Sequence, residues 1–219
     1  MGKIHIFTQE QKFILDKIAE IKYFKSNFYF TGGTALSAFY LQHRYSEDMD
    51  FFSEKELDNS LVFEFIDKLA KQYRFTFTSQ FKEIVYIFNL AFKNGVNLKI
   101  DFGIYPHKRV GKGIIFEGFN IDSLLDIAIN KLVSINQRAT VKDFVDLYFL
   151  LDMFSIWDLV EGVKVKFRMK VEPYILAMDL SEAEKFIYMP RMIKPLTLDK
   201  LKKFFREKAI ELGRKQVEE

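Results

Sequence analysis

The spacing of apolar and polar residues divides the chain into a mixed first half and a helical second half. In the first half, helical spacing predicts helices over residues 9–24, 34–42 and 61–73, and short apolar or alternating runs predict strands over 27–31, 48–53, 74–79, 83–93 and 96–105. Farther along, the pattern predicts helices over 122–136, 140–153, 155–163, 173–177 and 198–213. We therefore expect an α+β fold with two domains, residues 1–120 and residues 121–219.

The last predicted strand of the first half carries an acid in an apolar setting. After the turn at Asn94-Gly95, the apolar residues Val96, Leu98, Ile100 and Phe102 alternate with Asn97, Lys99 and Asp101. Successive side chains of a strand point to opposite faces, so Asp101 is expected on the polar face.

A second acidic pattern lies in the strand predicted at residues 48–53. Asp48 and Asp50 are expected on one face of this strand, and Met49 on the other. Neighbouring carboxylates repel each other unless a cation lies between them, and Mg²⁺ prefers such oxygen ligands. No core-packing argument places two acids on either side of Met49 and next to Phe51, so the pair indicates a functional site.

Two glycines precede this acidic pair. Gly32 and Gly33 follow a predicted strand and precede a predicted helix, where free backbone N–H groups can bind phosphate. Arg44 and Ser46 either contact phosphate or are ordinary loop residues, and His43 is expected at the surface.

The three carboxylates of Asp48, Asp50 and Asp101 would form one cluster if their strands are neighbours in a sheet. Such a cluster can hold two Mg²⁺ ions about 3.5–4 Å apart, which would clamp the attacking and leaving oxygens of an in-line displacement. The alternative is that each Asp lies at the surface or at a strand end with a local hydrogen bond.

The helical half adds further polar candidates. Lys131 lies on the apolar stripe of its helix. Its ammonium either reaches solvent at the edge of the core or binds a triphosphate. In the next helix, Thr140 is an expected N-cap, Asp143 complements the helix N-terminus, and Lys142 and Asp146 form an i,i+4 pair. Capping and a surface ion pair explain much of this cluster, but not why it interrupts so apolar a stretch.

Composition narrows the setting of these candidates. The chain has no cysteine, which excludes disulfides and thiolate metal sites and fits a reducing cytoplasm. No signal peptide is evident, and no apolar run has the roughly 18 residues that a membrane span needs. The net charge is +3 at pH 7, and lysine and arginine are concentrated in the last quarter of the chain. This basic part could contact nucleic acid or could simply form solvated helix faces.

Two sequence stretches resemble the AbiEii/AbiGii toxin family of the polymerase-β-like nucleotidyltransferase superfamily. The first comprises Thr31-Gly32-Gly33-Thr34-Ala35-Leu36 and Arg44-Tyr45-Ser46-Glu47-Asp48-Met49-Asp50-Phe51. The second comprises Lys131 and the run from Arg138 through Lys142-Asp143 to Asp146-Leu147-Tyr148. The resemblance covers residues 25–151 and implies a small mixed twisted sheet flanked by helices, followed by a helical C-terminal part.

The resemblance also implies roles for individual residues. The metal ligands would be Asp48, Asp50 and Asp101, and Asp101 would help to activate the attacking hydroxyl. Lys131 would meet the nucleotide, and Asp143 or Asp146 would complete the site. The residues expected to bind NTP are Gly32, Gly33, Thr34, Arg44, Ser46, Lys131 and Lys142.

These features predict a Mg²⁺-dependent nucleotidyltransferase, with Mn²⁺ as a second usable ion, that moves a nucleoside monophosphate from an NTP to an acceptor hydroxyl. The resemblance implies a cytoplasmic toxin of a toxin–antitoxin or phage-defence system, with tRNA or another RNA as the acceptor and a cognate antitoxin as partner. A catalytically silent NTP-binding protein and a metal-dependent nuclease are the alternatives.

Overall fold

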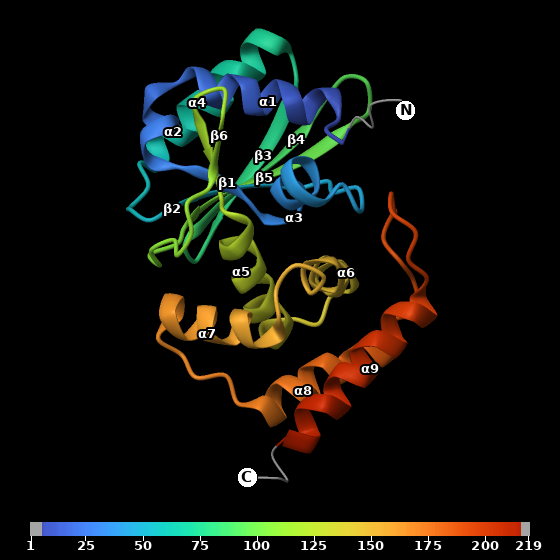
Figure 1. Ribbon diagram of the computed structural model, residues 1–219. Coiled ribbons are helices and arrows are strands. Elements are labelled where there is room, and N and C mark those ends of the chain that lie inside the picture. Colours follow the sequence, from blue (N-terminus) through green and yellow to red (C-terminus); the bar gives the residue numbers. More distant parts are fainter. Residues whose placement is uncertain (1–5, 216–219) are drawn as a thin grey trace. The chain divides into compact units, whose positions relative to one another are not determined.

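The computed structural model describes residues 6–215 and divides them into two compact units (Figure 1). Unit 1 comprises the described residues up to Ala38 together with Ser46–Lys108 and Gly113–Asp122. Unit 2 comprises Phe39–Tyr45, Arg109–Lys112 and the described residues from Ser123 onward.

A mixed sheet forms the centre of unit 1. Its strands, in the order β3-β4-β5-β2-β1-β7-β6, are β1 (Tyr29–Thr31), β2 (Met49–Ser53), β3 (Thr76–Lys82), β4 (Val85–Ala91), β5 (Asn97–Ile104), β6 (Ile114–Phe116) and β7 (Phe119–Ile121). The pairs β2–β5 and β1–β7 are parallel, whereas β1–β2, β3–β4, β4–β5 and β6–β7 are antiparallel. The α+β class predicted from the sequence is therefore confirmed.

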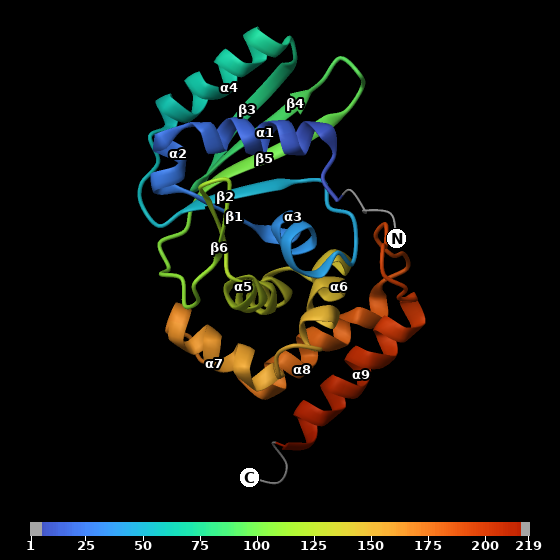
Figure 2. The same cartoon turned by 45° about the horizontal axis from the view of Figure 1, so that its top comes forward.

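Helices α1 (Gln9–Glu20), α2 (Lys22–Asn27) and α4 (Asn59–Tyr73) lie along one face of this sheet (Figure 2). The single helix predicted over residues 9–24 is in fact two helices, separated at Ile21. The backbone of Ile21 is extended, at φ −101° and ψ 123°. Thr8 begins α1 with a capping box in which its side chain accepts from the Gln11 N–H and the Gln11 side chain accepts from the Thr8 N–H.

Phenylalanines fill the space between the helices and the sheet. The rings of Phe51 and Phe102 stack with centroids 5.4 Å apart, and Phe30 and Phe88 extend this contact to the neighbouring strands. All four side chains are fully buried. Because strand side chains alternate, packing these rings on one face places the polar residues of β2 and β5 on the other.

The segment between β1 and β2 differs in type from the predicted helix over residues 34–42. It forms a single α-helical turn, α3 (Gly32–Ala35), followed by a π-helix, η1 (Leu36–Leu41). A further difference is the β6–β7 hairpin, which occupies a glycine-containing stretch for which no strand was predicted.

Helices make up most of unit 2. They are α5 (Leu124–Gln137), α6 (Val141–Leu150), α7 (Ile156–Phe167), α8 (Pro173–Ser181), the 3₁₀ turn η2 (Glu182–Lys185) and α9 (Leu198–Lys215). Helix α5 contacts α6, α7 and α8, and α9 packs against α6, α8 and η2. Among the described residues, no helix is long and apolar enough to cross a membrane.

A buried ion pair attaches a short loop to this helical unit. The Lys166 ammonium on α7 contacts the Asp126 carboxylate on α5 at 2.7 Å, and both side chains are inaccessible to solvent. The same carboxylate accepts hydrogen bonds from the backbone N–H groups of Val110 and Gly111 and from the Ser123 hydroxyl. Asp126 therefore holds the segment Arg109–Lys112 against α5.

Candidate functional site

Two of the predicted carboxylates are direct neighbours on the face of the unit 1 sheet opposite the rings of Phe51 and Phe102. Asp50 of β2 is paired with Asp101 of β5 in the parallel register. Met49 and Phe51, on either side of Asp50, are fully buried, whereas Asp50 itself is half-buried. Asp48 immediately precedes β2 and is exposed. The alternation that the sequence predicted is thus present in both strands.

Lys99 lies two residues before Asp101, on the same face of β5, and its ammonium donates a hydrogen bond to Oδ2 of Asp101. Burial alone would lower the pKa of Lys99. That effect is outweighed by the hydrogen bond and charge of Asp101 and by the charges of Asp48 and Asp50, so the pKa is raised. One cation of the protein therefore offsets part of the negative charge of the three carboxylates.

Gly32 brings the phosphate-binding turn predicted from the sequence against one of these acids. Its backbone is left-handed, at φ +74°, and a Cβ atom built on it would lie 2.0 Å from Oδ2 of Asp50. Any other residue would force the carboxylate to move. The turn and the Asp50 carboxylate thus share one small space, which only glycine leaves open.

Two further predicted residues, Thr34 and Ser46, are linked to the segment that leads into the acidic pair. The buried hydroxyl of Thr34 donates a hydrogen bond to the backbone carbonyl of Asp48, which fixes the entry to β2. The side chain of Gln11 donates to the backbone carbonyls of Ser46 and Glu47, at 2.9 and 3.1 Å. The phosphate contact proposed for the Ser46 hydroxyl remains a prediction.

The donor set in unit 1 fits a divalent cation, because its donor atoms are carboxylate oxygens, as hard cations prefer. Gly32 leaves room for the Asp50 carboxylate, whose Oδ2 lies where a side chain at residue 32 would begin. The Lys99 ammonium is bound to Asp101, so it offsets part of the negative charge that a cation would otherwise meet. Within residues 6–215, no three His, Asp or Glu side chains are arranged closely enough to bind a metal ion together.

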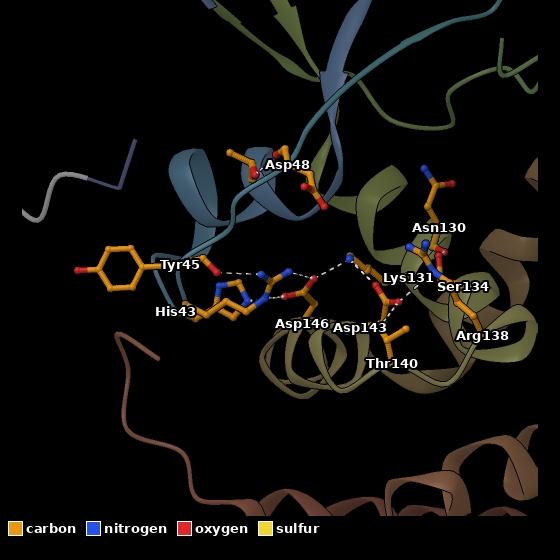
Figure 3. Close-up of polar contacts among 12 residues, drawn as sticks. His43, Tyr45, Asp48, Asn130, Lys131, Ser134, Arg138, Thr140, Asp143 and Asp146 are labelled. Carbon is orange, nitrogen blue, oxygen red and sulfur yellow. Dashed lines mark hydrogen bonds and ion pairs between the residues drawn. The ribbon is translucent and has the colours of Figure 1, made fainter. Parts of the chain in front are cut away.

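The other predicted acids belong to a buried ionic network in unit 2 (Figure 3). Asp146 of α6 is completely buried, and its two oxygens meet Nε and Nη2 of Arg44 at 2.6 and 2.8 Å. Its Oδ1 also lies 2.8 Å from Nε2 of His43, and its Oδ2 lies 2.6 Å from Nζ of Lys131. Burial raises the pKa of Asp146, but the positive charges of Lys131 and Arg44 reverse this and hold it far below its usual range.

Lys131 is buried, and its ammonium lies between two acids of α6 (Figure 3). It contacts Oδ1 of Asp143 at 2.6 Å in addition to Asp146. Burial lowers the pKa of Lys131, yet the charges of Asp146 and Asp143 outweigh that effect and raise it. Lys131 is therefore a protonated, internally paired lysine, and the alternative of a lysine extended to solvent at the core edge is wrong.

Asp143 is held from the helix end as well as from Lys131. Thr140 is the N-cap of α6 and donates its hydroxyl to Oδ2 of Asp143 at 2.7 Å, while Arg138 approaches the same oxygen at 3.3 Å. The predicted N-cap is thus confirmed. Lys142, the next residue of the predicted cluster, is half-buried, and its nucleotide contact remains a prediction.

The structure corrects the expectation for His43 and places Arg44 beside it in the buried network. His43 is completely buried rather than exposed, and burial lowers its pKa despite the opposing effect of Asp146. A neutral His43 that faces the ionised Asp146 must carry its proton on Nε2. Arg44 directs its guanidinium to Asp146 and to the Tyr45 carbonyl, and its phosphate contact remains a prediction.

The segment that carries these two residues is held by backbone hydrogen bonds to a distant part of unit 2. The His43 carbonyl accepts from the N–H groups of Ile193 and Lys194 at 2.8 and 2.9 Å, and Tyr45 donates to the Arg191 carbonyl at 2.9 Å. The Arg191 guanidinium also lies 4.1 Å from the centre of the Tyr45 ring. No local pattern near residue 43 signals this pairing.

Comparison with known proteins gives consistent results. The family model described as nucleotidyl transferase AbiEii toxin, type IV TA system, matches residues 14–218. An uncharacterised protein of Aquifex aeolicus (strain VF5) is 37% identical over 172 residues, which cover 73% of this chain and 75% of that protein.

Two solved structures share the fold. A protein of H. pylori described as a candidate nucleotidyltransferase aligns with a TM-score of 0.60 at 18% identity, covering 95% of this chain and 97% of its own. JHP933 from Helicobacter pylori aligns with a TM-score of 0.56 at 19% identity, covering 94% and 91%.

Proposed function

The chain belongs to the AbiEii family of nucleotidyl transferase toxins of type IV toxin–antitoxin systems, and from this premise we propose that it moves a nucleoside monophosphate from an NTP to a hydroxyl group of an RNA, such as a tRNA 3′ end. The observation that carries the proposal is the pairing of Asp50 with Asp101 beside the glycine turn at Gly32. A phosphate-binding turn and a carboxylate pair are the two parts that transfer from a triphosphate requires.

The metal ligands in this proposal are Asp48, Asp50 and Asp101, with Mg²⁺ as the physiological ion and Mn²⁺ as a substitute. The bound ion would neutralise charge on the phosphates and orient them. The backbone of Gly32 and Gly33 binds phosphate oxygens, and Thr34 holds the start of β2 in place through the Asp48 carbonyl.

Asp101 accepts the proton of the acceptor hydroxyl on a carboxylate oxygen. The hydroxyl oxygen then forms a bond to the α-phosphorus, and the bond from that phosphorus to the bridging oxygen breaks, which releases pyrophosphate. Lys99, bound to Asp101, orients this carboxylate before the proton arrives.

In unit 2 we retain a nucleotide contact of Lys131 as a prediction from the family, although its ammonium is paired with Asp143 and Asp146. Asp143 orients this ammonium, and Asp146 acts as a positioning residue, because Arg44, His43 and Lys131 already engage both of its oxygens. We further propose that residues 1–120 and 121–219 function as a nucleotidyltransferase core and a helical domain.

A cognate antitoxin and a role in abortive infection complete the proposal, and they rest on the family alone. NTPs and tRNA are cytoplasmic, so the reaction is assigned to that compartment.

The test is transfer of label from each α-labelled NTP to total RNA with Mg²⁺. Wild type is compared with Asp48→Asn/Asp50→Asn and with Asp16→Asn/Asp67→Asn, a control that removes two acids from surface ion pairs on α1 and α4. Label on RNA with wild type and the control, but not with the Asp48/Asp50 variant, supports the proposal. Full activity of that variant contradicts it. NTP binding without transfer would indicate a silent binding protein, and RNA shortening without NTP would indicate a nuclease.

A further inference from the structure

The face of the sheet that carries Asp50 and Asp101 continues onto strands β4 and β3. The register pairs Asp101 with Ile87 of β4, and Ile87 with Gln80 of β3. A second row runs from Lys99 through Asn89 to Thr78. Residues that face each other across strands share one face of a sheet, so these rows form a surface that begins at the carboxylates.

This surface is polar and open to solvent. We define the polar sheet face by six residues: Thr78, Gln80 and Lys82 of β3, Asn89 of β4, and Asn97 and Lys99 of β5. Lys99 is half-buried and the other five are exposed. Phe88 of β4 and Ile100 of β5 alternate with them and are buried on the other face, where Phe77 meets Phe63 of α4.

The charge of the polar sheet face is suited to a polyanion. Strands β3 and β4 contain no acidic residue. Lys82 supplies positive charge, Lys99 is paired with Asp101, and the other four side chains offer neutral amide or hydroxyl groups. Across these strands the only acid of this face is Asp101, at the end where an acceptor hydroxyl must be activated.

We propose that the polar sheet face binds the single-stranded 3′ end of the acceptor RNA, with its terminal hydroxyl at Asp101; this inference rests on the proposed nucleotidyl transfer. Neighbouring strands lie about 4.8 Å apart, so the face extends roughly 10 Å from β5 to β3. Amide and hydroxyl side chains can bind the 2′-hydroxyls and base edges of unpaired nucleotides, and Lys82 can contact a phosphate. Ile87, half-buried within the face, gives a sugar or base an apolar surface.

A protein partner fits this face less well. The buried centres of protein interfaces are rich in aromatic and other apolar residues, which the six side chains of this face lack. A strand added by a partner protein would bind the backbone edge of β3 and would not require these side chains.

The test measures binding of a fluorescent single-stranded RNA to the full chain by anisotropy, without NTP, next to calorimetric binding of each NTP. Thr78→Glu/Asn89→Glu introduces negative charge on the polar sheet face. Ser79→Glu is the matched control, since Ser79 is exposed on the same strand but alternates to the other face. We expect the double variant to bind RNA at least tenfold more weakly, Ser79→Glu to bind within twofold of wild type, and NTP affinity to be unchanged in both.

Salt dependence and a DNA probe sharpen the test. Removing one phosphate contact with Lys82→Gln should reduce the slope of log affinity against log salt by about 0.7. Unchanged RNA binding by Thr78→Glu/Asn89→Glu, or equal weakening by Ser79→Glu, overturns the inference, and equal binding of the matching DNA overturns its assignment to RNA. If wild type binds and cleaves NTP to pyrophosphate with a non-RNA acceptor but binds no RNA, this inference fails and nucleotidyl transfer stands. If the wild-type protein binds RNA but never releases pyrophosphate from NTP, the proposed nucleotidyl transfer fails and the RNA-binding inference stands.

Discussion

Gly32 lies so close to Asp50 that a Cβ atom on the glycine would be 2.0 Å from a carboxylate oxygen of the aspartate. The turn can therefore exist beside the Asp50 side chain only if residue 32 has no side chain. This contact joins the glycine pair and the acidic pair, which are separate motifs in the sequence, in one arrangement.

Replacing Gly32 with alanine should disrupt that arrangement beyond the ordinary cost of a left-handed backbone. The matched control is Gly95→Ala, because Gly95 has φ +85° and no atom within 4 Å of a built Cβ. Both variants should lose about 1–2 kcal/mol of stability from the backbone conformation. Only Gly32→Ala should lose stability beyond this backbone cost in urea unfolding. Only Gly32→Ala should also lose most of its transfer of label to RNA. Equal behaviour of the two variants would show that the contact with Asp50 is unimportant.

The Lys99 ammonium and a bound metal ion should act as alternative sources of positive charge for the carboxylates. Lys99→Met should therefore lower the melting temperature in EDTA, by an amount equivalent to about 1 kcal/mol because Lys99 is partly exposed. Added Mg²⁺ should stabilise this variant more than it stabilises wild type. Lys82→Met, which removes an exposed lysine from β3, is the control and should respond to Mg²⁺ as wild type does. An identical Mg²⁺ effect in all three proteins would contradict this exchange of charges.

Asp146 and Asp143 should differ sharply when each is changed to asparagine. Asp146→Asn leaves the buried Arg44 without its counter-charge and should cost about 3–5 kcal/mol in urea unfolding. Asp143→Asn leaves Lys131 paired with Asp146, so it should cost less stability while it reduces transfer. The double variant Arg44→Met/Asp146→Leu should lose less than the sum of its single changes, because no buried charge of this pair is left alone. Additive losses would argue against the ion pair as the source of the effect.

The local features of unit 1 could be predicted from the sequence because they depend on near neighbours. Alternation along residues 97–102 placed Asp101 on the polar face, and the same rule placed Asp48 and Asp50 together. Strand order was not needed for that step. The neighbouring positions of Asp50 and Asp101, however, depend on a parallel pairing across some fifty residues, which the acidic motif alone does not specify.

Where the sequence interpretation was wrong, the deciding contacts are distant or the elements are short. His43 and Arg44 are buried because Asp146, 103 and 102 residues away, compensates them. Polar residues next to a loop are otherwise expected at the surface. Strands β6 and β7 have three residues each, too few to establish an alternating pattern.

The buried histidine should give the protein a distinct acid sensitivity. The folded pKa of His43 is lowered because burial outweighs the nearby Asp146, so the unfolded chain binds a proton more readily. Stability should therefore fall as the pH drops below about 6.5, the unfolded value for histidine, and should keep falling toward the folded pKa. Asp143 and Asp146, the two acids of the network around His43, also have lowered pKa values, and their contribution to stability is lost only at lower pH, below about 4.

Urea unfolding of wild type and His43→Gln between pH 4.5 and 9 isolates this contribution, because a glutamine amide can also donate to Asp146 while it cannot titrate. The variant should show a flatter profile between pH 6.5 and 4.5. Between pH 7.5 and 9 the free energy of unfolding of both proteins should be independent of pH, which serves as the internal control. The pKa of Lys131 is raised, so its contribution to stability should be lost only as the pH rises beyond about 10.5. Parallel profiles throughout would mean that His43 is not the group that destabilises the folded protein in mild acid.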